Sequence, residues 1–234
     1  MEINNKKTNI LNLLKKINVE PKNLHLYLSA FVHNSYAYEQ HLDYNYQKLE
    51  FLGDSIIMFA VAKWLYLQHE HDWTVGQMSK TRSLIVQSKA TAKVAKEIGI
   101  DQCILVSKGF TKNTNLDLTK FLEDCYEALI GAIYLDHGID IAERVINETL
   151  LKNITSESLE NFTDYKTIFQ ELMMQYGKNE IRYKLVKNEH NNFCVELWCN
   201  NICYGKGTGA KIRDAEKLAA KEGVTKFIGK KVNR

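Results

Sequence analysis

The chain has 234 residues, of which 45% are hydrophobic and 25% are charged, a length and composition that fit a large globular domain and a small one. It has no long uninterrupted apolar run and no apolar signal-peptide stretch near its beginning, so the sequence excludes a membrane-embedded protein, and we expect a cytoplasmic one with no membrane partner. Residues 1–162 hold 17 Lys and Arg against 20 Asp and Glu, a net charge of −3, whereas residues 163–234 hold 14 against 8, a net charge of +6, so the C-terminal part is the expected binder of a polyanion.

Two helices are predicted at the start of the chain. The first runs from about Lys6 to Ile17 and ends before Pro21, whose fixed φ angle suits a turn or the first turn of the next helix. The second leads to His33. We expect this histidine to pack and to form hydrogen bonds rather than to act as a catalyst.

Residues 46–66 form a mostly apolar stretch with helical period that carries two acids, Glu50 and Asp54. They are four residues apart, which places their Cβ atoms roughly 5–6 Å from each other on one face of a helix. Two like charges buried among apolar side chains need a counter-ion, and a metal cation supplies one. For such a pair alone, the solvated stripe of an amphipathic helix is the favoured interpretation.

Two helix boundaries and a loop are predicted between residues 74 and 119. Thr74 and Gln77 have the spacing of a capping box. Ser88 is expected to cap a helix that Gly99 closes. Residues 107–119 have no period and several Asn, Thr and Gly, which is typical of a mobile loop, and we expect it to border a substrate cleft.

A second mostly apolar helix is predicted for residues 121–136. It carries Asp124 and Glu127, three residues apart and therefore on one face. If this helix crosses the first near their acids, four carboxylates gather in one place. Such a group is a site for hard divalent cations such as Mg²⁺.

The C-terminal part is predicted to contain a helix, three antiparallel strands and a final helix. Residues 153–162 break the helical pattern with small polar residues and make the expected linker. Asp164 can cap a helix that reaches Tyr176. Strands are expected near residues 182–187, 193–199 and 202–207, with a tight turn at residues 200–201 and a last helix over about residues 210–227. The five cysteines include no Cys-x-x-Cys pair, so we expect reduced, structural thiols.

Basic residues gather at the start of this last helix. Residues 205–209, Gly-Lys-Gly-Thr-Gly, read as a flexible turn that brings Lys211, Arg213 and Lys217 to the helix start. Cations at that end oppose the helix dipole at a cost of about 0.3–1 kcal/mol each, which a bound phosphate turns into affinity. A merely solvated basic helix start is the alternative.

Three segments carry a resemblance to a known family. They are Leu49-Glu50-Phe51-Leu52-Gly53-Asp54-Ser55, Asp124-x-x-Glu127-Ala128-Leu129-Ile130-Gly131-Ala132, and Phe31-Val32-His33-Asn34-Ser35-Tyr36, in which Val32 stands where Thr is usual. Together they resemble ribonuclease III, the double-stranded-RNA endonuclease, and the C-terminal third resembles that family's double-stranded-RNA-binding domain. The resemblance implies a multidomain protein with an all-α catalytic domain at residues 1–152, the linker at 153–162, and a small α+β (α-β-β-β-α) RNA-binding domain at 163–231.

The resemblance also implies a reaction. The family cuts double-stranded RNA by Mg²⁺-dependent endonucleolytic hydrolysis to 5′-phosphate and 3′-hydroxyl ends, in the processing of ribosomal and other structured RNA precursors. Glu50, Asp124 and Glu127 are the implied ligands of Mg²⁺, for which Mn²⁺ can substitute, and no small-molecule organic cofactor is implied. Asp54 and Glu127 are the implied catalytic residues, with Asp54 orienting water, although the roles of Asp54 and the ligands can exchange.

Contacts with RNA and with a second copy follow from the same resemblance. Besides the three basic residues at the last helix, the family's RNA contacts match Gln170 and Glu171 in the first helix of the C-terminal domain and His190 between its first two strands. Phe51 matches the residue that plugs a cavity of the partner in a homodimer. An aromatic side chain at this position also fits a plain core.

One departure from the family keeps a second hypothesis open. Gln47 stands where the family commonly has Glu, three residues before Glu50. Gln keeps a hydrogen-bonding oxygen but loses the charge, which indicates a supporting position. The second hypothesis is a double-stranded-RNA-binding protein whose nuclease domain only dimerises.

Overall fold

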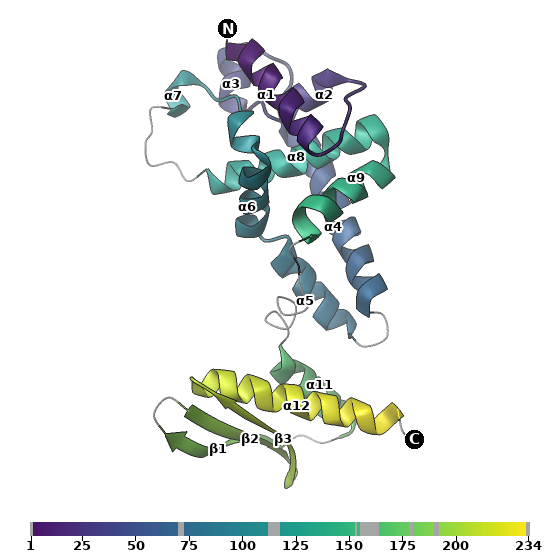
Figure 1. Cartoon of the computed structure of the whole chain (residues 1–234), viewed down its shortest axis with the longest axis vertical. Coiled ribbons are helices and arrows are strands. Elements are labelled where there is room, and N and C mark those ends of the chain that lie inside the picture. Colours follow the sequence, from purple (N-terminus) through teal and green to yellow (C-terminus); the bar gives the residue numbers. More distant parts are fainter. Residues whose placement is uncertain are drawn as a thin grey trace. The chain divides into compact units, whose positions relative to one another are not determined.

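The computed structural model describes residues 2–69, 73–111, 118–152, 154, 164–177, 180–189 and 192–232. The chain divides into two units, residues 1–160 and residues 161–234, and each is described by itself (Figure 1). The predicted boundaries at residues 152 and 163 stay a prediction. All of the predicted linker except Ile154 lies outside the described residues.

The first unit is helical, as predicted. Its elements in chain order are α1 (Glu2–Lys16), α2 (Leu24–Ser29), α3 (Asn34–Glu39), α4 (Gln47–His69), α5 (Val75–Ile85), α6 (Ser88–Ile98), the 3₁₀ turn η1 (Ile100–Gln102), α7 (Lys108–Thr111), α8 (Thr119–His137), α9 (Ile139–Ile146) and the π-helical turn η2 (Asn147–Leu151). In the described residues, no helix combines the length and the apolar run that crossing a bilayer requires.

Helix α8 is the centre of this unit. Every residue from Phe121 to Ile133 is buried, so the helix is covered on all sides, and α4, α6 and α9 all pack against it (Figure 1). Its buried Tyr126 is joined to the chain beyond α9. The Tyr126 hydroxyl lies 2.7 Å from Thr149 Oγ1. The two predicted acidic helices are therefore neighbours in the core.

The predicted helix ends are confirmed at two places. Thr74 caps α5 in a reciprocal capping box with Gln77. Gly99 closes α6 in the left-handed conformation, with φ of 95°. His33 caps α3, because its ring accepts a hydrogen bond from the backbone N–H of Ser35, and it packs against aromatic rings, in agreement with its predicted structural part.

The prediction that Ser88 caps α6 is wrong. The N-cap is Gln87, which forms no side-chain capping hydrogen bond, and Ser88 is already the first helical residue. The Ser88 hydroxyl instead donates to Glu123 Oε2 on α8, at 2.5 Å. The side chain thus serves a contact between helices rather than the helix end. In the loop predicted for residues 107–119, α7 occupies 108–111, and residues 112–117 lie outside the described residues.

The second unit has the predicted order of elements. They are α11 (Tyr165–Gln175), β1 (Ile181–Glu189), β2 (Asn192–Cys199), β3 (Ile202–Gly209) and α12 (Ile212–Val232). The strands pair antiparallel in the order β1-β2-β3, and Asp164 caps α11 by accepting from the Thr167 N–H. Phe169, Leu197 and Ala219 are fully buried where the two helices meet the sheet. All five cysteines of the chain are free.

The turns of this unit confirm one prediction and correct another. Asn200 and Asn201 have φ of 45° and 65°, the tight hairpin turn that was expected. The glycines of residues 205–209 are not in a flexible turn, because they lie in β3. A Cβ added at Gly205 would lie 2.2 Å from Ala219 O, and one added at Gly207 would lie 2.1 Å from Ala215 O. Glycine is needed there so that β3 can lie against α12.

Candidate metal centre and nucleic-acid interface

Two glycines set the crossing of α4 and α8. A Cβ added at Gly53 would lie 1.7 Å from Glu127 O, and a Cβ added at Gly131 would lie 2.3 Å from Leu49 O. No side chain fits at either position without separating the helices. The close approach places the first turns of α4 beside the middle of α8, where the acids of both helices lie.

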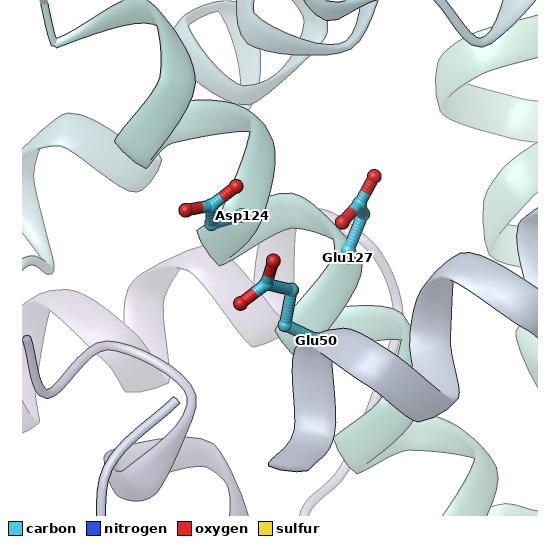
Figure 2. Close-up of side chains that lie close together, drawn as sticks. All are labelled: Glu50, Asp124 and Glu127. Carbon is cyan, nitrogen blue, oxygen red and sulfur yellow. The ribbon is translucent and has the colours of Figure 1, made fainter. Parts of the chain in front are cut away.

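Three carboxylates meet at this crossing. Glu50 comes from α4, and Asp124 and Glu127 come from α8 (Figure 2). One ligand oxygen from each of the three lies within 4.8 Å of the other two. Asp124 is 6% exposed and Glu127 is 8% exposed, while Glu50 is half-buried. The predicted convergence of the two acidic helices is therefore present.

Asp54 does not join the other three acids, although four carboxylates were expected to gather at the crossing. Its side chain is exposed, and it is not among the three carboxylates whose oxygens converge. It is nevertheless close enough for its charge to act on Glu127. The start of α4 thus has one acid facing the α8 carboxylates and one exposed to solvent, and the separate roles of the two acids stay a prediction.

A bound cation would stabilise the ionised form of the three clustered carboxylates. Burial, together with the negative charges of Asp54 and Glu123, raises the pKa of Glu127 to about 8. Burial and the charge of Asp124 raise the pKa of Glu50 above its ordinary value. Both carboxyl groups are therefore costly to ionise where they stand, and a bound divalent cation removes that cost.

The oxygens present fit a hard divalent cation such as Mg²⁺ or Mn²⁺. The set consists of carboxylates alone, which are the ligands that these ions prefer. Asp124 Oδ1 is buried and receives no well-aligned hydrogen bond from the described residues, although Lys120 Nζ lies 2.8 Å from it as an ion pair. Asp124 Oδ2 accepts from the Tyr46 hydroxyl at 3.2 Å. One oxygen of this carboxylate thus accepts a hydrogen bond, and the other faces a positive charge.

Sequence reasoning missed four residues around the acids. Lys120 and Glu123 lie in the same turn as Asp124, and Lys120 could have been found because it stands four residues before Asp124, the spacing of a helical ion pair. Glu123 carried a weaker signal, a third acid in an apolar run. Tyr46 and Ser88 carried none, because only the tertiary structure brings them to the α8 carboxylates.

The described residues among the predicted RNA contacts lie on α11 or at the start of α12. Gln170 and Glu171 are exposed on α11. Lys211 precedes α12 and Arg213 lies in its first turn, both exposed, whereas Lys217 is half-buried one turn later. His190 lies outside the described residues. The described candidates therefore lie on the two helices that cover the sheet or directly before one of them.

The two helices are tied together beside these positions. Lys166 of α11 forms an ion pair with Glu216 of α12 and lies over the ring of Tyr183, 4.8 Å from its centroid. This contact fixes α11 relative to the basic start of α12. The ion pair, together with the packing of both helices on the sheet, holds the candidates on α11 and α12 at one spacing.

The sequence matches known families over both units. Residues 23–154 match the family model described as Ribonuclease-III-like, and residues 165–226 match the double-stranded RNA binding motif. The chain is 36% identical over 231 residues to Ribonuclease 3 of Ureaplasma parvum, and the alignment covers 96% of this chain and 97% of that protein. It is 42% identical over 219 residues to Ribonuclease 3 of Mycoplasmoides gallisepticum. This alignment covers 93% of this chain, and the chain spans only 33% of the length of that relative.

A solved structure agrees with the sequence matches. The nuclease domain of ribonuclease III from Campylobacter jejuni is 31% identical, with a TM-score of 0.56, over 61% of this chain and 96% of that one. The first unit thus has the helical nuclease fold, and the second has the three-stranded sheet and C-terminal helix of the RNA-binding motif. With both units matched in order along one chain, the protein belongs to the ribonuclease III family.

Proposed function

We propose that the chain is an endoribonuclease that hydrolyses double-stranded RNA with a divalent cation, Mg²⁺ or Mn²⁺, held by Glu50, Asp124 and Glu127. The observation that carries the proposal is the convergence of these three carboxylates in a chain that also has a double-stranded RNA binding motif. When bound, the cation would polarise the phosphodiester and lower the pKa of an attacking water. Hydrolysis of this kind needs no organic cofactor.

The chain's own residues have distinct parts in this proposal. The Tyr46 hydroxyl holds Asp124 in the orientation that presents its other oxygen. Exposed Asp54 is the carboxylate that accepts a hydrogen bond from the attacking water and orients it for in-line attack. Attack on phosphorus with departure of the 3′ oxygen leaves 5′-phosphate and 3′-hydroxyl ends.

The substrate and assembly complete the proposal. The second unit binds the duplex through Gln170, Glu171, His190 and the basic residues at α12, and two copies of the chain supply one site for each strand. The Campylobacter jejuni structure is described as flexible in a region involved in dimer formation. The substrates would be ribosomal and other structured RNA precursors, in the cytoplasm.

The test is the change Glu127→Gln, which keeps the shape of the side chain and removes its charge. We expect the variant to dimerise and to bind long duplex RNA in Ca²⁺, measured by gel shift, because the RNA-binding surfaces are untouched. Cleavage in Mg²⁺ should be at least about a hundredfold slower, a loss of about 2.7 kcal/mol in transition-state stabilisation.

Glu20→Gln is the matched control, since this exposed carboxylate lies outside the group of acids. Its cleavage rate should equal that of the unchanged chain. Near-normal cleavage by Glu127→Gln would remove this residue from the site.

Gln47 supports a second candidate, a double-stranded-RNA-binding protein whose nuclease domain only dimerises. Gln47 is exposed at the first residue of α4, where the family commonly has Glu. If the endonuclease proposal holds, Gln47→Glu changes cleavage by less than about tenfold, or roughly 1.4 kcal/mol. An inert chain that this single change switches on would favour the second candidate.

A further inference from the structure

The ammonium group of a lysine lies beside the clustered acids of α8. Lys120 Nζ lies 2.8 Å from Asp124 Oδ1 and 3.2 Å from Glu123 Oε2. The lysine side chain is 69% exposed, whereas the side chains of the two acids are 9% and 10% exposed. The ammonium group is thus delivered from the surface by a long side chain to acids that are themselves almost enclosed.

The second partner of this lysine is fixed from another helix. Glu123 is buried, and its Oε2 atom accepts a hydrogen bond of 2.5 Å from the hydroxyl of Ser88 on α6. This contact ties Glu123 to a helix that supplies no acid to the metal group. Glu123 therefore has a contact that does not depend on what binds at Asp124.

The same oxygen of Asp124 cannot serve the lysine and a divalent cation together. An ammonium group within hydrogen-bonding distance of a ligand oxygen would repel a dication bound to that oxygen. The lysine chain has four rotatable carbons, so its head can move while its stem stays in place. Glu123 Oε2, already 3.2 Å away, is the nearest place for it to go.

We propose that Lys120 is a resident cation that neutralises Asp124 when no divalent ion is bound, and that Glu123, fixed by Ser88, holds the ammonium group after a divalent ion displaces it. The inference rests on the proposed metal site at Glu50, Asp124 and Glu127. In this inference Lys120 competes with the metal for Asp124. Glu123 is a positioning residue that weakens this competition, because it holds the ammonium group away from Asp124. The site then has a lower metal affinity than its three carboxylates alone would give.

The first test measures Mn²⁺ binding to the full chain by calorimetry, with Glu127→Gln to identify the site. Lys120→Gln removes the competing charge and should bind Mn²⁺ at least about fivefold more tightly. Lys89→Gln is the matched control, because Lys89 is exposed on α6 and forms no ion pair within the described residues, and it should stay within about twofold. An affinity of Lys120→Gln that is unchanged or weaker would overturn the inference.

The second test separates the part of Glu123 from that of a direct ligand. Glu123→Gln should weaken Mn²⁺ binding at least about threefold in the unchanged chain, because the ammonium group then stays on Asp124. In the Lys120→Gln background the same change should have less than about a twofold effect. Equal losses in both backgrounds would show that Glu123 acts on the metal directly and would overturn its proposed part.

A third measurement needs no metal and keeps the two proposals apart. In EDTA, Lys120→Gln should lower the melting temperature by at least about 2 °C, since the carboxylates lose their counter-charge, and Lys89→Gln should not. Absence of Mn²⁺ binding in every variant would refute the metal site, and with it the competition. Normal Mn²⁺ binding in the unchanged chain, with an affinity that Lys120→Gln does not raise, would refute the resident cation alone.

Discussion

Glu127 is one residue through which pH is expected to act on the stability of the first unit. Its pKa is raised from 4.5 to about 8 by burial and by neighbouring negative charges. Between these two values the folded protein keeps a proton that the unfolded chain has released. The free energy of unfolding therefore falls as pH rises through this range and levels off above pH 8.

This linkage predicts a measurable difference in EDTA. The melting temperature should fall from pH 6 to pH 8, and it should fall less for Glu127→Gln, which has no proton to lose there. Mg²⁺ should raise the melting temperature more at pH 8 than at pH 6, because cation binding must displace the proton at the lower pH. An identical pH slope in both proteins would show that Glu127 is not the titrating group.

Residue spacing was enough to predict the acids but not their surroundings. The four acids were found because each pair is spaced for one helix face, in a run otherwise too apolar for solvent. The exposure of Asp54 was not foreseen, since it depends on how far α8 extends over the first turns of α4. The contacts of Tyr46 and Ser88 were likewise invisible, because their partners lie 78 and 35 residues away.

At the scale of helices, Gly53 controls the distance between α4 and α8. Gly53→Ala should destabilise the protein by at least about 3 kcal/mol, because the new methyl group meets backbone atoms that cannot rotate away. Cleavage should fall too, since separation of the helices moves Glu50 away from the acids of α8. Urea unfolding measures the first effect, and a cleavage assay measures the second.

Gly76→Ala is the control for this prediction. Gly76 lies in the first turn of α5, and the nearest atom to an added Cβ there is Thr74 Oγ1, at 3.8 Å. Alanine should change the free energy of unfolding by no more than about 1 kcal/mol, in the stabilising direction. Equal unfolding midpoints for the two variants would mean that α4 and α8 adjust without loss.

In the second unit, Lys211 and Arg213 are predicted to contact phosphates. Changing both to Ala should weaken binding to every duplex sequence alike, because RNA duplexes are recognised by shape over roughly 16 base pairs. The slope of log affinity against log salt concentration should become shallower by about 2, since two phosphate contacts are lost. Fluorescence anisotropy at several salt concentrations measures both.

The matched control removes two positive charges from β1. Arg182 and Lys184 alternate with Tyr183, which faces Lys166 on α11, so they point to the other side of the sheet. Their change to Ala should leave the salt slope nearly unchanged. A loss confined to one RNA sequence after the Lys211 and Arg213 changes would indicate base readout instead of phosphate contact.

Element order was predictable from sequence because period and caps are local signals. The helical period of residues 46–66 and the Asn-Asn turn each depend on a few neighbouring residues. The glycines of β3 were misread because the same residue type serves flexible turns and close packing. Only the position of α12 over the strand distinguishes the two uses.

At the scale of the whole molecule, the first unit exposes apolar side chains along α4. Phe51, Phe59 and Tyr66 are 80%, 53% and 54% exposed, and they recur every seven or eight residues, which is about two helical turns. Val75 and Met78 of α5 line a groove beside Phe59 and Tyr66. Exposed apolar side chains of this kind are typical of a site for another protein, and the proposed second copy is the expected occupant.

Phe51 tests this assignment most directly. Its exposure contradicts the alternative of a plain core residue, so its removal should leave the fold of a single copy intact. Phe51→Ala should shift the protein toward monomer in sedimentation equilibrium, because an aromatic side chain buried between copies supplies much of the energy of an interface. Tyr38→Ala is the control, since Tyr38 is 86% exposed but lies on α3, and it should sediment as the unchanged protein does. A dimer that persists in Phe51→Ala with unchanged stability would place the contact between copies elsewhere on the first unit.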